Sequence, residues 1–507
     1  MIDSAKKGKV YLVGAGPGDP GLITVRGAEL LKLADCIICD KLANPALLSL
    51  ARQDAEVIHV PKRVGTTSFT QTEINELLVE KAGEGKIVVR LKGGDPCVFG
   101  RGSEELGVLA EAGIDFEIVP GVTAAIAAAD YTGIMLTDRK YSSQVVLVTG
   151  REAEGKQKSN IDWQWLAKFE GTIVFYMGVG NLDFIAGKLM ENGMSETMPA
   201  AVIADITLPS QRTVKAPLKL IAERCQQQAI EPPALIIVGT AASGDEKLNW
   251  FAKKPLFGKS IVVTRDDRGN ADLAARIIRE GGMPVEFPTI KIKPLTTGTE
   301  FLEALVKFTE YDWIVFTSIN GVTVFFDALE SLGKDARVLA SAKVAVIGGE
   351  TANKLLQFGI KPDFVPTVFT SRELGKQLIG FTNLQDKKLL LLRSDLASKE
   401  LAELLLTAQA QVDEVAVYKI ESAKTEGGWL EEKIRQKQID WLTFASASSA
   451  RIFFEQISPD LVKTSGVKVA SIGPVTSELL EDLGIQIDVE AEEHTIEGLL
   501  EAIKRFY

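Results

Sequence analysis

The chain has 507 residues, 46% of them hydrophobic and 25% charged, which is too long for one hydrophobic core and typical of a globular protein of several domains. Its net charge of −11 argues against a nucleic-acid partner. No apolar run approaches the roughly 18 residues of a membrane helix, and the N-terminal residues hold no signal-peptide core. We therefore expect a cytoplasmic protein without a membrane partner.

Short β-branched runs alternate with helical stretches along the whole chain, which predicts α/β domains. The first run, residues 10–13, predicts a buried strand followed by a glycine-rich loop at 14–21 (GAGPGDPG). A dinucleotide-binding loop opens directly into a helix. Here Pro17 and Pro20 prevent this, and the next helix is predicted from Thr24. A nicotinamide-dependent enzyme is therefore disfavoured, although the glycines still let the backbone approach a ligand.

The next strand-like run contains Cys36 and Cys39 in a C-x-x-C spacing. In a strand, positions i and i+3 point to opposite faces, so the pair is badly placed to share a metal ion. Two buried thiols are the preferred interpretation. With only His59 and His494 in the chain, a multi-histidine metal site is also disfavoured, and we expect no metal cofactor.

Two further glycine loops follow predicted strands. Residues 92–102 (KGGDPCVFGRG) come after a strand at 86–91 and lead into a helix, and residues 119–125 (VPGVTAA) open an Ala-rich helix. Gly93 and Gly94 would let a ligand lie against the main chain, and the Asp95 carboxylate can accept hydrogen bonds from it. Three such loops at strand ends predict a ligand site at one edge of a sheet.

Residues 246–258 interrupt this alternation, because they are polar apart from an isolated Trp and Phe and end in Pro255 and Gly258. They are predicted to be the linker between a first half, residues 1–245, and a second half, residues 259–507.

The second half contains an internal repeat. Residues 259–265 and 312–326 recur 128 residues later, as 387–393 and 440–454. Residues 344–360 recur 125 residues later, as 469–485, and in that frame Thr370 and Thr495 are each predicted to cap a helix. This self-similarity predicts two copies of one α/β unit, with a small-molecule site in the cleft between two lobes. A duplicated scaffold without a site is the alternative.

The motifs of the first half resemble those of the tetrapyrrole methylases, in particular uroporphyrinogen-III C-methyltransferase. The resemblance covers about residues 8–243 and rests on VYLVGAGPGDPGLIT, RLKGGDPCVFGRGSEE and PGVTAAIAAADYTGIMLTDR. It implies a two-lobed α/β methylase fold, unlike the Rossmann methyltransferases, and a homodimer. It also implies transfer of two methyl groups from S-adenosylmethionine to C2 and C7 of uroporphyrinogen III, which gives precorrin-2.

Carried over position by position, the resemblance implies nine contacts to the methyl donor: Pro17, Gly93, Gly94, Asp95, Val98, Thr123, Ala124, Met177 and Ile206. Asp40 and Lys62 match positions proposed for proton handling, and Arg101 matches an arginine proposed to bind substrate or act as base. Two positions depart from the family. Ile206 replaces the usual Gly, so a contact there is expected through main-chain atoms, and Asp138 replaces the usual His of the substrate pocket.

The implied chemistry suits these residue types. A reduced pyrrole carbon is nucleophilic and a sulfonium methyl is already activated, so the reaction needs alignment and a route for the departing proton. The eight substrate carboxylates need cations. Seven basic residues lie in or beside the loops: Lys62, Arg63, Arg90, Lys92, Arg101, Arg139 and Lys140.

The second half resembles uroporphyrinogen-III synthase over about residues 257–507. The resemblance rests on IVFTSINGV at 314–322, FASASS at 444–449, IGPVTS at 472–477, the Tyr418 segment and the duplication. It implies a two-lobed fold in which lobe one comprises 259–293 plus 419–507 and lobe two comprises 297–416. The implied reaction is the dehydration and ring closure of hydroxymethylbilane with inversion of ring D.

An enzyme of this kind must hold one conformer of its substrate, which calls for hydroxyl and backbone contacts. The predicted substrate-binding residues are Arg265, Thr317, Ser318, Ser446, Ser448 and Thr476. Tyr418 is predicted to assist loss of the substrate hydroxyl. The alternatives are that Tyr418 packs at the hinge and that the Ser and Thr residues cap helices.

Three functions are compatible with these motifs. The leading one is a bifunctional enzyme. A methyltransferase with a non-catalytic, ligand-binding C-terminal module is the second. A methyltransferase acting on RNA or a protein residue is the third, and the acidic balance and the GGDPCVFGRG stretch disfavour it.

Overall fold

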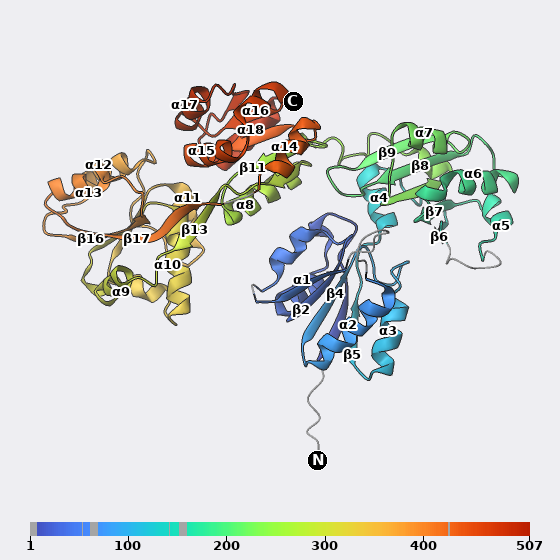
Figure 1. Ribbon diagram of the computed structural model, residues 1–507, viewed down its shortest axis with the longest axis horizontal. Coiled ribbons are helices and arrows are strands. Elements are labelled where there is room, and N and C mark those ends of the chain that lie inside the picture. The colour runs from blue at the N-terminus through green and yellow to red at the C-terminus, as the bar shows by residue number, and fades with distance from the viewer. Residues whose placement is uncertain (1–7, 53, 61–68, 141, 152–159, 424–425) are drawn as a thin grey trace, which may run out of the picture. The chain divides into compact units, whose positions relative to one another are not determined.

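The computed structural model describes residues 8–52, 54–60, 69–140, 142–151, 160–423 and 426–507. It divides into two compact units (Figure 1). Unit 1 extends to Ser260 and also contains Arg276–Met283, and unit 2 contains Ile261–Ala275 and Pro284–Tyr507. Over the described residues, each unit holds two five-stranded sheets.

The first sheet of unit 1 is wholly parallel, with the strand order β3-β2-β4-β1-β5. Its strands are β1 (Lys9–Gly14), β2 (Cys36–Asp40), β3 (Glu56–Val60), β4 (Ile87–Lys92) and β5 (Asp115–Val119). The connecting helices are η1 (Pro20–Leu22), α1 (Val25–Leu33), η2 (Pro45–Leu50), α2 (Gln71–Gly83) and α3 (Gly102–Glu111). The predicted helix start is confirmed, because the Thr24 side chain accepts a hydrogen bond from Gly27 N at 3.1 Å and caps α1.

The two cysteines of β2 lie on opposite faces of this sheet, as the strand period predicts. Cys36 packs with Ile38 in one apolar cluster and Cys39 with Ile37 in another. Burial raises the pKa of each thiol to about 11, so both stay protonated and unreactive near neutral pH.

We expect a thiol reagent at pH 8 to label Cys97, which is exposed, and to spare the buried Cys36, Cys39 and Cys225 of the native chain. Mass spectrometry of iodoacetamide-treated protein would measure this, with urea-unfolded protein as the control in which all four react. Fast native labelling at Cys36 or Cys39 would contradict the packing described.

The second sheet of unit 1 is mixed, with the order β6-β7-β10-β8-β9. β6 and β7 are parallel, and the other pairs are antiparallel. Its strands are β6 (Val145–Thr149), β7 (Thr172–Tyr176), β8 (Pro199–Ala204), β9 (Arg212–Pro217) and β10 (Ala234–Val238). Its helices are α4 (Ala124–Thr132), α5 (Trp163–Ala167), η3 (Val179–Asn181), α6 (Leu182–Glu191), α7 (Ile221–Gln227) and η4 (Thr240–Ser243). The alanines of α4 pack on this sheet, so the third glycine loop leads from one sheet to the other.

The predicted linker, residues 246–258, is packed against unit 1. Phe251 is only 3% exposed, and its ring lies 4.9 Å from Tyr131 and 5.2 Å from Phe257. Leu256 is fully buried. These buried apolar residues lie in an otherwise polar stretch that has neither a helical nor a strand period. The composition of residues 246–258 therefore resembles that of a flexible linker.

Unit 2 contains two sheets with related topology. The first has the order β12-β11-β18-β19-β20, with β11 (Ser260–Val263), β12 (Met283–Glu286), β18 (Trp441–Phe444), β19 (Lys468–Ser471) and β20 (Val489–Glu490). The second has the order β13-β17-β16-β14-β15, with β13 (Ile290–Pro294), β14 (Trp313–Phe316), β15 (Lys343–Val346), β16 (Lys388–Ser394) and β17 (Gln411–Ser422). The helices are α8 (Asp267–Arg279), α9 (Thr299–Val306), η5 (Phe308–Glu310), α10 (Ile319–Ser331), η6 (Ala336–Leu339), α11 (Gly349–Leu356), α12 (Ser371–Phe381), α13 (Glu400–Thr407), α14 (Gly428–Arg435), α15 (Ala447–Gln456), α16 (Pro459–Ser465), α17 (Pro474–Asp482) and α18 (Ile496–Arg505).

The repeat is visible in these elements, since β11, β18 and β19 correspond to β16, β14 and β15. Thr370 and Thr495 cap α12 and α18, as predicted. The chain passes between the two sheets of unit 2 at slightly different residues from those predicted. β13 pairs antiparallel with β17, from Ile290 opposite Ser422 to Pro294 opposite Tyr418, so both of these connecting strands belong to the second sheet (Figure 1).

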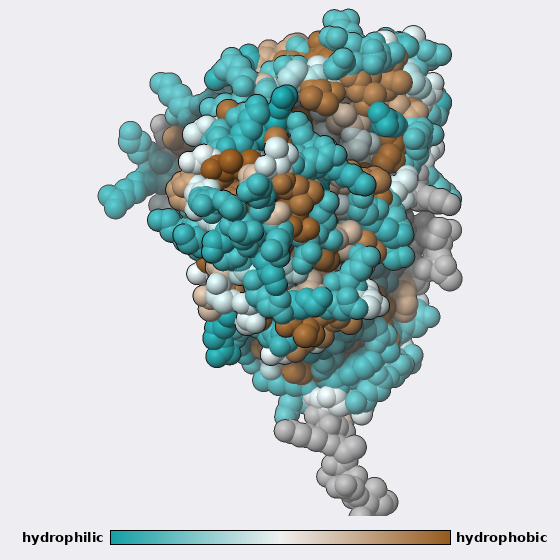
Figure 2. Space-filling view, turned by 90° about the vertical axis from the view of Figure 1, so that its left-hand side faces the viewer, coloured by the Kyte–Doolittle hydropathy of each residue, from teal (hydrophilic) through white to brown (hydrophobic). Residues whose placement is uncertain are grey.

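None of the described helices is long and apolar enough to span a membrane. On the face shown in Figure 2, hydrophilic residues predominate and apolar ones are scattered among them.

Candidate functional site

The three glycine loops of unit 1 meet at one edge of its parallel sheet. Gly16 N donates to Gly94 O at 3.2 Å, and Gly94 N donates to Gly16 O at 2.7 Å. A Cβ added to Gly14 would lie 2.5 Å from Gly121 Cα, and one added to Gly121 would lie 2.2 Å from Gly94 O. Glycine is therefore required here because three backbones touch one another.

The Asp95 carboxylate ties the second loop to the third. Its Oδ1 accepts from Cys97 N at 2.8 Å, and its Oδ2 accepts from Gly121 N at 3.0 Å. Each carboxylate oxygen keeps a second lone pair, so a ligand contact is still available. Asp95 thus organises the loops, and its predicted contact to the methyl donor stays a prediction.

The junction leaves room for a ligand above Gly94. This residue has φ +67°, and a Cβ built on it would meet no atom within 4 Å. Val98, Thr123 and Ala124, in the second and third loops, are half-buried. Met177, from the loop after β7, is 53% exposed. Eight of the nine predicted contacts therefore lie in the three glycine loops or, for Met177, in the loop after β7.

Ile206 can reach a ligand only through its main chain. Its side chain is 6% exposed and packs with α4. A Cβ on Gly18 would lie 2.8 Å from Ile206 O, so this segment runs against the first glycine loop near Pro17. The other departure from the family, Asp138, is exposed, and its carboxylate accepts from Lys140 N at 2.8 Å within a turn.

Several residues in these loops adopt left-handed backbone conformations. The φ values of non-glycine residues in the loops after β4, β7 and β8 are 55° at Phe99, 57° at Arg101, 56° at Met177, 50° at Asp205 and 67° at Thr207. Such conformations persist only where surrounding contacts enforce them, and they concentrate at functional sites.

Tyr176 links two of the loops, and the sequence analysis did not predict it as a site residue. Its Oη lies 2.7 Å from Thr123 Oγ1 and accepts from Ala125 N at 3.0 Å. Phe99 packs on its ring at 4.9 Å. Burial raises the pKa of Tyr176, so the phenol is protonated near neutral pH. The sequence signal was its position next to Met177.

Of the residues predicted for proton handling and substrate binding in unit 1, Asp40 is largely buried and Arg101 is more exposed. Asp40 ends β2 with its side chain 22% exposed, and Arg90 donates a hydrogen bond to its carboxylate. Arg101 is half-exposed and makes two hydrogen bonds of 2.6 Å to Glu104. Lys62 and Arg63 lie outside the described residues.

Two predicted substrate cations are wrong. Arg90 is 0% exposed and Lys92 is 1% exposed. Both donate to Glu105 Oε1, from Arg90 Nε at 3.3 Å and from Lys92 Nζ at 2.8 Å. They alternate with Leu91 on β4 and point into the unit, where both pair with Glu105 of α3 and Arg90 also pairs with Asp40. They therefore cannot contact a substrate carboxylate.

In unit 2, Tyr418 of β17 faces the start of α10. Its Oη lies 3.0 Å from Ser318 Oγ, and Ser318 caps α10 by accepting from Gly321 N at 2.9 Å. Tyr418 is 5% exposed, and burial raises the pKa of its phenol. A phenol of this kind is suited to donating a proton and not to accepting one.

The other predicted substrate contacts lie after strands of the two sheets. Ser446 caps α15 by accepting from Ser449 N at 3.1 Å, as in the capping alternative, and its Oγ lies 3.1 Å from Ser448 Oγ. Arg265 and Thr317 are half-buried at strand ends. Thr476 is 3% exposed in the first turn of α17, and its predicted contact to the substrate stays a prediction.

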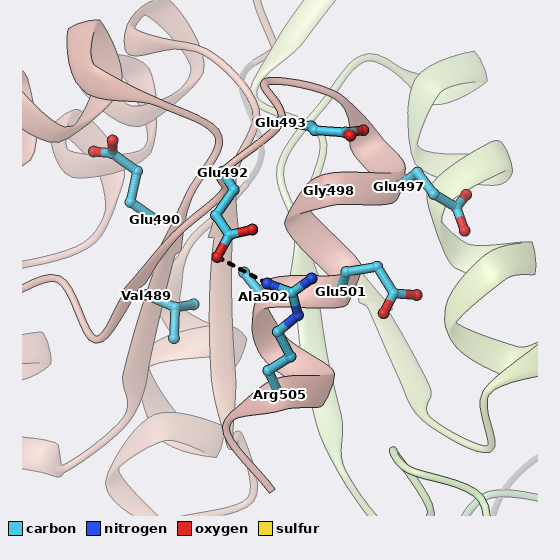
Figure 3. Close-up of a pocket in the computed structure, with 9 residues that line it drawn as sticks. All are labelled: Val489, Glu490, Glu492, Glu493, Glu497, Gly498, Glu501, Ala502 and Arg505. Atoms are coloured by element: carbon cyan, nitrogen blue, oxygen red, sulfur yellow. Dashed lines mark ion pairs between the residues drawn. The ribbon is translucent and has the colours of Figure 1, made fainter.

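A cavity on the C-terminal elements contains none of the predicted site residues. It is lined by the side chains shown in Figure 3: Val489, Glu490, Glu492, Glu493, Glu497, Gly498, Glu501, Ala502 and Arg505. Arg505 pairs with Glu492 at 2.8 Å. The remaining carboxylates would repel an anionic ligand, so this cavity does not suit a polycarboxylate substrate.

Glycine turns at a parallel sheet edge, followed by a duplicated α/β unit, define a two-part α/β enzyme. Residues 9–222 match the family model described as tetrapyrrole (corrin/porphyrin) methylases, and residues 271–501 match that of uroporphyrinogen-III synthase HemD. The chain belongs to the tetrapyrrole methylase family through its first half and to the uroporphyrinogen-III synthase family through its second.

Curated relatives match nearly the whole chain or a large part of it. The chain is 38% identical to the porphyrin biosynthesis protein HemD of Ruminiclostridium josui, over 98% of this chain and 97% of that one. It is 40% identical to the uroporphyrinogen-III C-methyltransferase of Bacillus subtilis (strain 168), over 71% and 74%. A crystal structure of the Thermus thermophilus uroporphyrin-III C-methyltransferase with S-adenyl homocysteine is 38% identical and covers 46% of this chain and 99% of that chain, with a TM-score of 0.41.

Proposed function

We propose that unit 1 methylates uroporphyrinogen III at C2 and C7 with S-adenosylmethionine, giving precorrin-2, and that unit 2 makes uroporphyrinogen III from hydroxymethylbilane. The observation that carries the first activity is the meeting of three glycine loops beneath an open surface at Gly94. The family membership of both halves supports the pairing, because the product of one reaction is the substrate of the other.

The residues of unit 1 fit this methyl donor. Gly94 leaves space for a ligand to lie against the backbone, and Val98 and the exposed Met177 are apolar residues of the loops after β4 and β7 that could contact it. When bound, S-adenosylmethionine supplies a methyl group activated by its sulfonium. The chain then has to align the pyrrole carbon with that methyl group and remove a proton.

Asp40 is our candidate to accept the proton that the methylated carbon loses. β2 and β4 are neighbours with Cys39 opposite Leu91, so Asp40 lies beside the start of the second glycine loop. Arg90 holds its carboxylate in place. Arg101, at the far end of that loop, is our candidate to bind a substrate carboxylate, since its guanidinium forms bidentate pairs.

In unit 2, the proposed chemistry begins with loss of the substrate hydroxyl. The protonated Tyr418 phenol donates to that hydroxyl as the carbon–oxygen bond breaks, and water departs. Ser318 orients the phenol at 3.0 Å. The substituted carbon of ring D then attacks the carbon that has lost its hydroxyl. The older bond from this ring carbon to its bridge toward ring C breaks, and the bridge bonds instead to the free α-carbon of ring D, which inverts this ring. The proton that this α-carbon loses returns to the Tyr418 phenolate. The hydroxyls of Thr317 and Ser446 and the cation of Arg265 are our candidates for holding the productive conformer.

Hydroxymethylbilane alone tests the synthase. We expect purified full-length protein to form the type III isomer rapidly, as measured by chromatography of the oxidised porphyrins. Formation of type I only would show that unit 2 is not a synthase and would favour a ligand-binding module. Adding S-adenosylmethionine should then produce the precorrin-2 chromophore, and its absence would contradict the proposed methyltransferase.

Tyr418→Phe is expected to slow type III formation about 100-fold, since it removes the proton donor while keeping the buried ring. Tyr311→Phe is the matched control. Tyr311 is also buried in unit 2, and its Oη donates to Asp413 Oδ2 at 2.6 Å. Equal rates in Tyr418→Phe and Tyr311→Phe would leave Tyr418 with only a packing role.

The family relationship also leads us to propose a cytoplasmic homodimer formed through unit 1. No nucleic-acid or membrane partner and no metal are part of this proposal.

A further inference from the structure

A closed ring of four hydrogen bonds lies beneath the first glycine loop. Tyr131 Oη donates to Asp19 Oδ2 at 2.7 Å, and Asp19 N donates to Thr207 Oγ1 at 2.7 Å. Thr207 N donates to Gln211 Oε1 at 2.8 Å, and Gln211 Nε2 returns to Tyr131 O at 3.4 Å. We call Asp19, Tyr131, Thr207 and Gln211 the four-residue ring.

The four-residue ring joins three segments that carry or flank predicted methyl-donor contacts. Asp19 lies in the first glycine loop and caps η1, accepting from Gly21 N at 2.8 Å. Thr207 sits in the segment after β8 with a φ of 67° and is 3% exposed. Tyr131 lies at the end of α4, which begins just after Thr123. The path of each segment thus depends on the others.

Residues of the predicted linker pack against Tyr131, one of the members of the four-residue ring. The Trp250 and Phe251 rings lie 5.0 Å and 4.9 Å from the Tyr131 ring. Trp250 Nε1 donates to Asp130 O at 2.8 Å. A Cβ on Gly133, which ends α4, would lie 2.9 Å from the main chain of Leu248. Residues 245–251 therefore run closely along the end of α4.

The Trp250 and Phe251 rings pack against the Tyr131 ring and leave little of Tyr131 exposed. Tyr131 is 8% exposed, and burial raises the pKa of its phenol, so the hydroxyl stays protonated and donates. A hydrogen bond from a hydroxyl to a carboxylate is strengthened when the surroundings are apolar.

We infer that Trp250 and Phe251 are positioning residues of the methyl-donor site, which act by holding Tyr131 so that its hydroxyl fixes the first glycine loop through Asp19. This inference rests on the proposed function of unit 1. It places the segment between the two halves inside the methyltransferase, so that this unit extends past residue 245.

Binding of S-adenosylhomocysteine to the full-length chain tests the inference by calorimetric titration. Tyr131→Phe keeps the aromatic ring but removes the donor to Asp19, and we expect its Kd to rise about tenfold. Trp250→Ala should raise the Kd on the order of tenfold too, and Trp250→Phe should restore most of the affinity. In methyl transfer, both weakened variants should raise the KM for S-adenosylmethionine more than they lower kcat.

Trp165→Ala is the control, because Trp165 of α5 is half-exposed like Trp250 and packs on Phe169 at 5.0 Å. Its affinity should equal that of the wild type. Thermal unfolding checks that each variant is folded. Gln211→Met opens the four-residue ring without touching either aromatic ring, and it should weaken binding even if Trp250→Ala unfolds.

Unchanged affinity and KM in folded Tyr131→Phe and Gln211→Met would overturn the inference and leave the proposed function standing. A wild-type chain that binds no S-adenosylhomocysteine would overturn the proposed function and this inference with it.

Discussion

Replacing Asp95 with alanine is expected to weaken S-adenosylhomocysteine binding roughly 100-fold, while unit 2 continues to form the type III isomer at the wild-type rate. The carboxylate accepts two backbone hydrogen bonds, from Cys97 N at 2.8 Å and from Gly121 N at 3.0 Å. Without it, the second loop loses its bond to the third, and both amides lose their partner. The surface around Gly94 would no longer be held in one shape.

The measurements are calorimetric titration with S-adenosylhomocysteine and the hydroxymethylbilane assay on the same preparation. Asp335→Ala is a matched control, because the Asp335 carboxylate makes a similar turn in unit 2, accepting from Arg337 N at 3.0 Å. It should bind the methyl-donor product normally. Loss of both activities in folded Asp95→Ala protein would contradict the independence of the two units.

Removing the Glu105 carboxylate is expected to destabilise unit 1 by about 3–5 kcal/mol. Glu105 Oε1 accepts from three side chains, Arg90 at 3.3 Å, Lys92 at 2.8 Å and Gln71 at 3.2 Å. Glu105 and Arg90 are both 0% exposed, so Glu105→Ala leaves the buried Lys92 without this carboxylate partner and Arg90 with the Asp40 carboxylate alone. Burial already lowers the pKa of Lys92, and loss of this carboxylate favours its neutral form further.

Scanning calorimetry of the full chain measures this effect, as a lower unfolding temperature for unit 1 with an unchanged transition for unit 2. Glu104→Ala is the neighbouring control. Glu104 is half-exposed and pairs with Arg101 at 2.6 Å, and such surface pairs contribute about 1 kcal/mol or less. An unfolding temperature of unit 1 in Glu105→Ala equal to that in Glu104→Ala would contradict this prediction, because other groups would then compensate the buried charges.

The sequence by itself determined the features that depend on local pattern. The period of a strand places Cys36 and Cys39 on opposite faces. Thr24, Thr370 and Thr495 cap helices because their side chains reach amides three residues ahead. The glycine loops are predictable for a similar reason, since each follows a strand and parallel strands end at one edge.

Only the tertiary structure decided which charges are available and which segments belong together. In the sequence, Arg90 and Lys92 resemble substrate-binding cations beside a glycine loop. In the structure both are buried and pair with Glu105, which lies on the helix that follows this loop. Trp250 lies 120 residues from Asp130, to which it donates, and nothing in its polar neighbourhood signals that contact. Burial and long-range hydrogen bonding depend on how distant segments pack, and a local pattern of residues does not specify that packing.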